Sequence, residues 1–172
     1  MTTKLVISAL GNDRPGIVDE LTNIIYTNNL NVEDSRMTVL GGEFAILLLV
    51  SGNAENIENL STQVEDIEQT LHMRLLLKPT STPTNKDHSI PYAVNVAALD
   101  HPGIVHNLSE FFSSRKINIM DLQTERYAAP HTGSPMFALH MTIGLTAQTN
   151  IAELREAFMD FCDERNLDAV LT

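Results

Sequence analysis

The chain has 172 residues, of which 43% are hydrophobic and 19% charged, a composition typical of a folded globular protein. Its formal net charge is −11, from 22 acidic and 11 basic residues. Because nucleic-acid affinity depends largely on lysine and arginine neutralising phosphates, this balance argues against direct nucleic-acid binding. No apolar run reaches the roughly 18 residues that a membrane span needs. With one cysteine, an internal disulfide is excluded, and we expect a cytoplasmic protein without membrane contact.

The first predicted element is a strand over residues 4–11, which ends at the turn residues Gly11-Asn12-Asp13. A short run of Leu, Val and Ile bounded by turn residues is typical of a buried strand. From Ile17 the apolar residues recur at helical spacing, and we expect this helix to end near Asn28. Asp13 is the expected N-cap, and Pro15 suits the first turn because its missing N–H would be unpaired there.

A hairpin, a second helix and a last strand complete the first half. Residues 32–40 and 44–50 are joined by Gly41-Gly42, and two apolar runs around such a pair predict a hairpin. Apolar residues at alternating spacings of three and four predict one amphipathic helix over about residues 54–71. Residues 73–77 form the last predicted strand. The order βαββαβ is the ferredoxin-like, or split βαβ, motif.

The first half then recurs. Asp13-Arg14-Pro15-Gly16-Ile17-Val18 reappears 87 residues later as Asp100-His101-Pro102-Gly103-Ile104-Val105, which indicates a duplicated fold unit. The hairpin connection is longer in the second copy, where residues 128–135 replace the Gly-Gly pair. Such a loop more often carries function or contacts a partner than a tight turn does. The predicted strands of this half cover residues 90–99, 118–127, 136–145 and 168–171, and its helices begin near Ile104 and Ile151.

We therefore predict an α+β protein of two ferredoxin-like domains in tandem. The domains are expected at residues 1–79 and 90–172, with a polar, proline-containing linker at residues 80–89. Units of about 80 residues bury modest cores. For this reason we expect the halves to pack on each other or on a second chain, as in a homodimer.

Each Asp-x-Pro-Gly segment leads from a strand into a helix, whose N-terminus offers unpaired N–H groups and partial positive charge to a carboxylate or phosphate. Gly16 and Gly103 have no Cβ, so a ligand could approach the backbone closely. The alternative is an ordinary helix start, and duplication alone does not show binding. Asn31 and Asn118 open the following strand, which we expect to pair with the first strand of its half and to begin at the opposite end of the sheet.

No catalytic or metal-binding pattern accompanies these loops. The six histidines lack metal-ligand spacing, and no nucleotide-binding or hydrolase motif is present. Asp34 and Asp121 recur on strands, where we expect them to bond backbone or solvent. Cys162 lies on the apolar side of the last helix and is expected to be a buried structural thiol. We predict no enzyme activity, no metal and no cofactor.

Both copies resemble the amino-acid-binding ACT domain, in tandem over essentially the whole chain. The residues that carry the resemblance are the two motif segments with Asn31-Val32-Glu33-Asp34-Ser35-Arg36 and Asn118-Ile119-Met120-Asp121-Leu122. It implies a regulatory sensor that binds an amino acid against the strand–helix loop, at an interface between ACT domains. His101 stands where the first copy has Arg14, so the two sites need not be equivalent. The ligand-binding residues that the resemblance implies are Asn12, Asp13, Gly16, Ile17, Leu99, Asp100, His101, Gly103 and Ile104.

Residues 10–18, 33–37 and 40–44 more closely resemble one kind of ACT protein, a transcriptional repressor that acts through a LysR-type activator and is relieved by glycine. This implies glycine as the ligand, a LysR-type activator as the partner, and no direct nucleic-acid contact. An alternative is a tandem ACT regulatory subunit that controls a metabolic enzyme in response to another amino acid. A small enzyme that uses the cleft between the halves is a third possibility, disfavoured by the missing catalytic residues.

Overall fold

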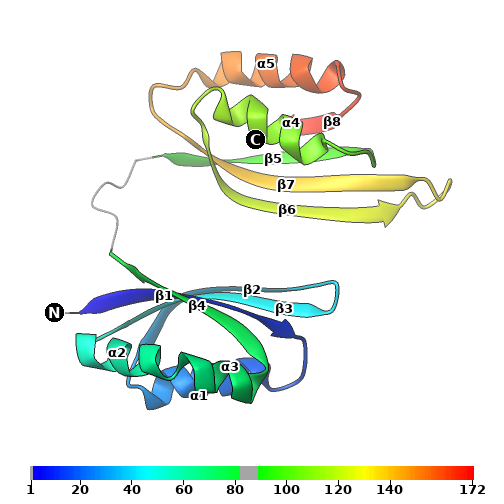
Figure 1. Cartoon of the computed structure of the whole chain (residues 1–172). Helices are drawn as coiled ribbons and strands as arrows, with labels where there is room; N and C mark the ends of the chain where they lie inside the picture. Colours follow the sequence, from blue (N-terminus) through cyan, green and yellow to red (C-terminus); the bar gives the residue numbers. More distant parts are fainter. Residues whose placement is uncertain (1, 82–88) are drawn as a thin grey trace. The chain divides into compact units, whose positions relative to one another are not determined.

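The computed structural model describes residues 2–81 and 89–172, and the chain divides into two compact units, Met1–Thr84 and Asn85–Thr172. Each unit contains a four-stranded antiparallel sheet with its helices on one face (Figure 1). The predicted α+β fold of two ferredoxin-like repeats is therefore confirmed. The exact domain boundaries stay a prediction, and most of the predicted linker, residues 82–88, lies outside the described residues.

In the first unit, β1 is a central strand that pairs with β3 on one side and β4 on the other, in the order β2-β3-β1-β4. The expectation that β2 pairs with β1 was wrong, because the tight hairpin places β3 beside β2 and β1 already has two neighbours. Gly41 and Gly42 form the hairpin turn with positive φ angles of 62° and 90°. The elements are β1 (Thr3–Asn12), α1 (Ile17–Thr27), β2 (Asn31–Leu40), β3 (Glu43–Gly52), α2 (Ala54–Thr62), α3 (Val64–Leu71) and β4 (Met73–Thr80).

The second unit repeats this topology with the order β6-β7-β5-β8, so β6 and β5 are not neighbours either. The register between strands also repeats. Leu10 pairs with Arg74 in the first unit, and Ala97, which lies 87 residues after Leu10, pairs with Asp168 in the second. The elements are β5 (Ile90–Leu99), α4 (Ile104–Ser113), β6 (Asn118–Ala128), β7 (Pro135–Leu145), α5 (Ile151–Asp163) and β8 (Asp168–Leu171).

The helix predicted over residues 54–71 is interrupted at Gln63, where α2 ends and α3 begins. Two hydroxyls just before the break bond backward to carbonyls of their own helix, Ser61 to Ile57 and Thr62 to Asn59, each at 2.8 Å. Such bonds compete with regular helical pairing and favour a bend. The apolar spacing continued across the break, which is why the pattern predicted a single helix.

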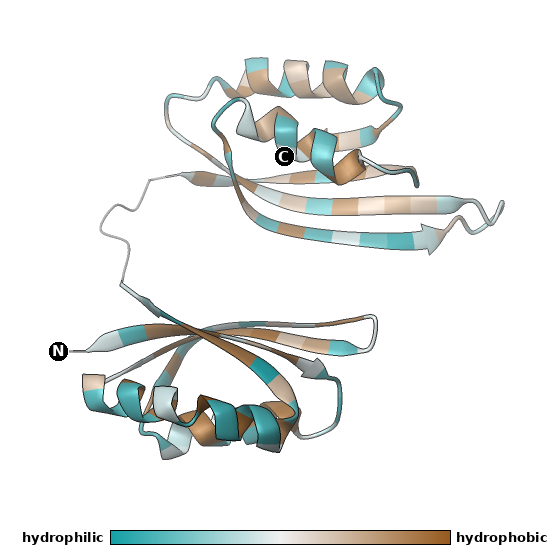
Figure 2. Cartoon of the chain, viewed as in Figure 1, coloured by the Kyte–Doolittle hydropathy of each residue, from teal (hydrophilic) through white to brown (hydrophobic). Residues whose placement is uncertain are grey.

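Each unit has a hydrophobic core between its helices and one face of its sheet. In the second unit the core contains a cluster of phenylalanines, with ring centroids of Phe112 and Phe158 5.4 Å apart. The other sheet face carries no helix of the same unit, and hydrophobic residues recur along the strands (Figure 2). In the first unit Leu47 is 51% and Leu76 68% exposed. Among the described residues, no helix is long and apolar enough to span a membrane.

Replacing Phe112 by alanine should destabilise the protein by about 3–5 kcal/mol, because the side chain is fully buried in the phenylalanine cluster. Urea unfolding followed by circular dichroism measures this change. Glu110→Ala, at an exposed position of the same helix, is the control and should change the unfolding free energy by less than about 0.5 kcal/mol. Equal effects of the two changes would contradict the position of this core.

Cys162 is fully buried in this core, as predicted, and burial together with the neighbouring Asp163 raises the pKa of its thiol to about 11. Since the thiolate is the reactive form, a thiol reagent at pH 8 should react slowly with the native protein and rapidly with the unfolded protein. The unfolded state loses this proton first, so stability should fall as the pH rises from about 8.5 towards the native pKa. Rapid modification of the native protein would contradict the buried thiol.

Candidate ligand-binding loops

The first motif loop joins the central strand β1 to α1 through a left-handed glycine. Gly16 has φ 89° and ψ −8°, and it precedes the first helical residue, Ile17. The backbone N–H of Asp13 donates to the carbonyl of Gly42 at 3.1 Å, which fastens the loop to the hairpin tip. Asp13 is not the N-cap that the sequence predicted. That position belongs to Gly16, because the left-handed turn separates the aspartate from the helix, and no side chain caps it.

The second motif loop has the same geometry. Gly103 has φ 97° and ψ −7°, and the backbone N–H of Asp100 donates to the carbonyl of Pro135 at 2.9 Å. Pro135 ends the longer hairpin connection, whose bend is closed by a 2.9 Å bond from the N–H of Ala129 to the carbonyl of Ser134. Both motif loops are thus held by a carbonyl at the hairpin end of the sheet, and the role of the longer connection stays a prediction.

The predicted ligand residues gather within each loop, and most of them face solvent. Ile17 and Ile104 are the exceptions, at 2% exposure, so their side chains anchor the helices in the core and only their backbone could meet a ligand. Asp100 is half-buried, and its carboxylate lies 2.8 Å from the Nε of Arg126. Asn31 pairs with Ser51, at the sheet end opposite to the loop, as predicted.

In the first loop, Arg14 and Glu20 form a two-bonded ion pair. The guanidinium donates Nη1 to Oε1 at 2.6 Å and Nη2 to Oε2 at 2.7 Å. These hydrogen bonds lower the pKa of the Glu20 carboxyl and raise the pKa of the Arg14 guanidinium. A Cβ added to Gly16 would lie 3.6 Å from the Glu20 carboxylate, so this pair stands directly over the start of α1.

The second loop has no equivalent ion pair. The position of Glu20 is occupied by Asn107, whose amide nitrogen would lie 3.7 Å from a Cβ added to Gly103. His101 replaces Arg14, and its Nδ1 lies 3.0 Å from the carbonyl of Pro102. This position lies beyond the repeated motif and was not predicted as part of the site. The same 87-residue offset pairs Glu20 with Asn107, so the sequence contained the signal.

The two helix starts consequently differ in charge. The first turn of α1 carries Asp19 and Glu20, whereas the first turn of α4 carries no acidic residue. Acidic side chains in the first turn offset the positive end of the helix dipole. The partial positive charge at the start of α1 is therefore already offset by Asp19 and Glu20. The start of α4 has no such acidic residue and is more favourable for an anion.

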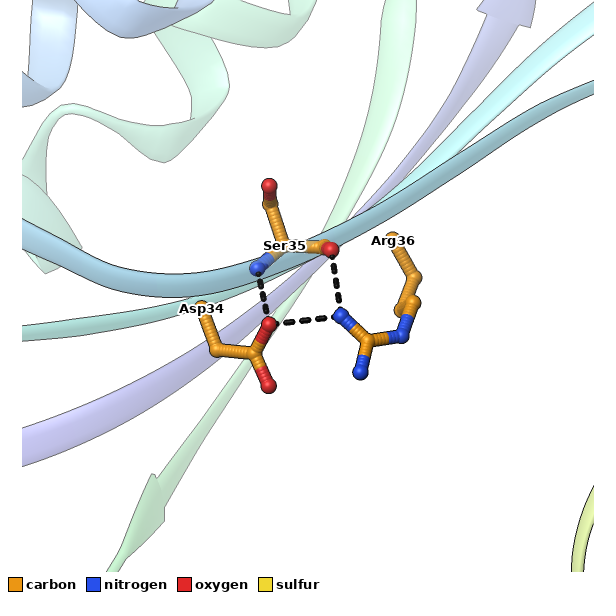
Figure 3. A network of polar contacts seen from close by, with 3 residues as sticks. All are labelled: Asp34, Ser35 and Arg36. Carbon is orange, nitrogen blue, oxygen red and sulfur yellow. Dashed lines mark hydrogen bonds and ion pairs between the residues drawn. The ribbon is translucent and has the colours of Figure 1, made fainter.

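Asp34, which recurs as Asp121 in the second half, bonds to its own neighbours in the chain (Figure 3). Its Oδ1 accepts from the backbone N–H of Ser35 at 2.8 Å and from Nη1 of Arg36 at 2.6 Å. The interpretation of Asp34 as a strand residue that bonds backbone is confirmed. Within residues 2–81 and 89–172, no group of three or more His, Cys, Asp or Glu side chains could hold a metal ion.

Residues 3–78 match the family model of the ACT domain. Since the second unit repeats the topology, register and motif loop of the first, the chain consists of two ACT-like repeats in tandem. A crystal structure described as that of an unknown protein from Galdieria sulphuraria has a TM-score of 0.82 and 28% identity, and the match covers 99% of this chain and 98% of the other.

A more particular likeness is to the glycine cleavage system transcriptional repressor. The protein of that name from Escherichia coli is 28% identical over 162 residues, which are 94% of this chain and 85% of the relative. A crystal structure described as that of a candidate glycine cleavage system transcriptional repressor has a TM-score of 0.76 and 27% identity. That match covers all of this chain and 97% of the other.

Replacing Gly103 by alanine should destabilise the protein by about 1–3 kcal/mol, because a side chain strains the left-handed backbone even though the added Cβ would meet Asn107 at an ordinary contact distance of 3.7 Å. Thermal unfolding measures the loss. Gly144→Ala is a contrasting variant, since its added Cβ would meet Ser89 at 2.9 Å without any left-handed φ, and its cost would come from crowding instead. A fully neutral Gly103→Ala would contradict the observed turn.

Proposed function

We propose that this chain is a non-catalytic regulator that senses an amino acid, with glycine as the leading ligand, and represses glycine-cleavage genes through a LysR-type activator. The observation that carries the proposal is the 28% identity over 94% of the chain to a protein named for that repression. The net charge of −11 supports action through a DNA-binding partner, because an acidic protein is repelled by phosphates. The proposal implies a cytoplasmic protein, and a homodimer stays a prediction.

The amino acid is proposed to bind at the motif loops, with Asn12, Asp13, Gly16 and Ile17 in the first copy and Leu99, Asp100, His101, Gly103 and Ile104 in the second. The ligand carboxylate would lie against first-turn N–H groups, which have no partner within the helix. The second loop is the stronger candidate, because the first turn of α4 has no acidic residue and the side chain beside Gly103 is the uncharged Asn107. In the first loop the Glu20 carboxylate opposes a bound anion.

Ligand binding is proposed to act by shifting a conformational equilibrium. A ligand can shift such an equilibrium only by its difference in affinity for the two states. In this account the LysR-type activator binds the ligand-free state more tightly, and glycine favours the state that releases it.

Exchanging the residues over the two helix starts tests the loops directly. Asn107→Glu should weaken glycine binding by about tenfold or more, since a carboxylate then faces the ligand carboxylate, and Glu20→Asn should strengthen binding at the first copy. Isothermal titration calorimetry with glycine and L-serine measures both changes. Glu110→Gln, further along α4 and exposed, is the matched control and should leave affinity unchanged. Unaltered binding in Asn107→Glu would remove the second loop from the proposal.

Repression itself is tested with a glycine-cleavage reporter gene in cells with and without the LysR-type activator. The full chain should lower expression only when the activator is present, and added glycine should restore it. Pull-down with the tagged chain should recover the activator. Recovery of a metabolic enzyme in its place, with no effect on the reporter, would favour the alternative of a tandem ACT subunit that controls an enzyme.

A further inference from the structure

A groove separates α4 from α5, which lie side by side over the sheet of the second unit (Figure 1). One hollow of about 450 Å³ is lined by Asn107 and Glu164, where α4 begins and α5 ends. A second hollow, of about 360 Å³, lies beside Asn150 at the start of α5. Both are lined by Arg115 and Ala157, so they adjoin and form one groove, here called the helix groove. Since α5 has 13 residues and is about 20 Å long, the groove can accommodate several turns of another helix.

The floor of the helix groove is aromatic and held in place. The ring centroids of Phe111 and Phe161 lie 4.8 Å apart. The guanidinium of Arg115 covers the first ring, 3.8 Å from its centroid, and donates Nη1 to the Phe111 carbonyl at 2.9 Å. Arg165 repeats this on the Phe161 ring, at 4.0 Å, with a 3.2 Å bond to the Phe161 carbonyl and a 3.3 Å contact to Glu164. Side chains that are fixed in this way lose little conformational freedom when a partner binds.

The rim of the helix groove is acidic. Three exposed carboxylates, those of Glu153, Asp160 and Glu164, follow α5 at spacings of seven and four residues and therefore share one side of the helix. Glu110 lines the groove from α4, and Arg115 is the basic residue in its lining. Among the residues that the structure describes, no lysine, arginine or histidine lies within ion-pair distance of Glu110, Glu153 or Asp160. The groove thus presents negative charge that its own side chains do not neutralise.

The first unit shows that the fold does not require these features. The 87-residue offset pairs Arg115 with Asn28 and Phe111 with Ile24. The Asn28 side chain accepts from Nε2 of Gln63 at 3.2 Å, and this bond joins the end of α1 to the break between α2 and α3. In the first unit a side-chain bond therefore connects the helices at this position, whereas in the second unit an arginine covers an aromatic ring there. Preservation of the fold does not explain the aromatic floor or the acidic rim.

We propose that the helix groove binds a basic amphipathic helix of the DNA-binding activator, a choice of partner that rests on the function proposed above. When a helix lies in a groove, its apolar side chains contact the floor. Its lysines and arginines would pair with the carboxylates of the rim through charge-assisted hydrogen bonds. DNA-binding proteins carry basic helices, because their lysines and arginines neutralise phosphates. The charge of the rim is complementary to such a helix.

The same charges disfavour other occupants. A second copy of this chain has a net charge of −11, so its surface is repelled by an acidic rim. A membrane surface with anionic lipids is repelled for the same reason. A nucleic acid has no cationic surface to meet here, since its phosphates would face the carboxylates.

Charge removal tests the rim. Affinity of the full chain for the purified LysR-type activator is measured by biolayer interferometry at several salt concentrations. Replacing Glu153 and Glu164 by glutamine and Asp160 by asparagine should weaken binding by about tenfold and reduce its salt dependence. The matched control removes the same number of negative charges from exposed positions on the helices of the first unit and should leave binding within about twofold of the wild type. Its substitutions are Glu55→Gln, Glu58→Gln and Glu65→Gln.

Filling the centre of the helix groove is an independent test. Ala157→Arg adds a long cationic side chain where the two hollows meet, and it should weaken activator binding by about tenfold or more. Ala152→Arg, at an exposed position of the same helix and outside both hollows, is the matched control and should bind as the wild type does. Circular dichroism of each variant verifies that it is folded.

Unchanged affinity in both groove variants would overturn the inference and leave the proposed function standing, as would an equal loss in the rim variant and its first-unit control. Loss of self-association in the rim variant, with activator binding retained, would assign the groove to a second copy and also overturn it. If the wild-type chain does not bind the activator, the proposed function is rejected, and a synthetic peptide then decides the groove.

The peptide has about 18 residues of leucine and lysine in an amphipathic pattern and is titrated into the full chain under amide NMR. Shifts of the amides of Phe111, Ala157 and Phe161 that disappear in the rim variant and persist in its first-unit control would support a groove for basic helices. Absence of shifts at these amides would reject the groove.

Discussion

A left-handed glycine at the end of the central strand determines how each unit is built. Gly16 and Gly103 turn the chain from the sheet into the first helix with φ angles near 90°, which side chains with a Cβ rarely adopt. The preceding aspartate N–H is tied to the hairpin end of the same sheet, at Gly42 in one unit and Pro135 in the other. The turn thereby sets where the first helix begins and presents its N-terminal amides at the surface.

Duplication preserved this turn while the side chains around it diverged. In the first unit the helix start is occupied by the ion pair between Arg14 and Glu20, and in the second by Asn107 and His101. The same backbone thus supports two different electrostatic surfaces, and the functional proposals follow from those differences.

Much of the fold could be predicted from the sequence, because apolar periodicity and turn residues are local properties. The repeated Asp-x-Pro-Gly segment predicted that the chain has two similar units, and Gly41-Gly42 predicted the hairpin turn. Strand order was harder, since β2 and β1 are brought near by one helix but separated by β3. The break at Gln63 depends on side-chain to backbone bonds that apolar spacing does not report.

The site could be predicted only in part for a similar reason. The motif located the loops, but the group over each glycine comes from the next turn of the helix, four residues further on. Asp13 was expected as a cap, yet the left-handed turn moves it away from the helix start.

A crystal structure of the full chain grown in saturating glycine tests the central claim, that the left-handed turn serves as a receptor, most directly. The account predicts electron density for glycine at the second loop, with its carboxylate within hydrogen-bond distance of first-turn amides of α4. Well-resolved motif loops with no glycine at either of them would contradict it.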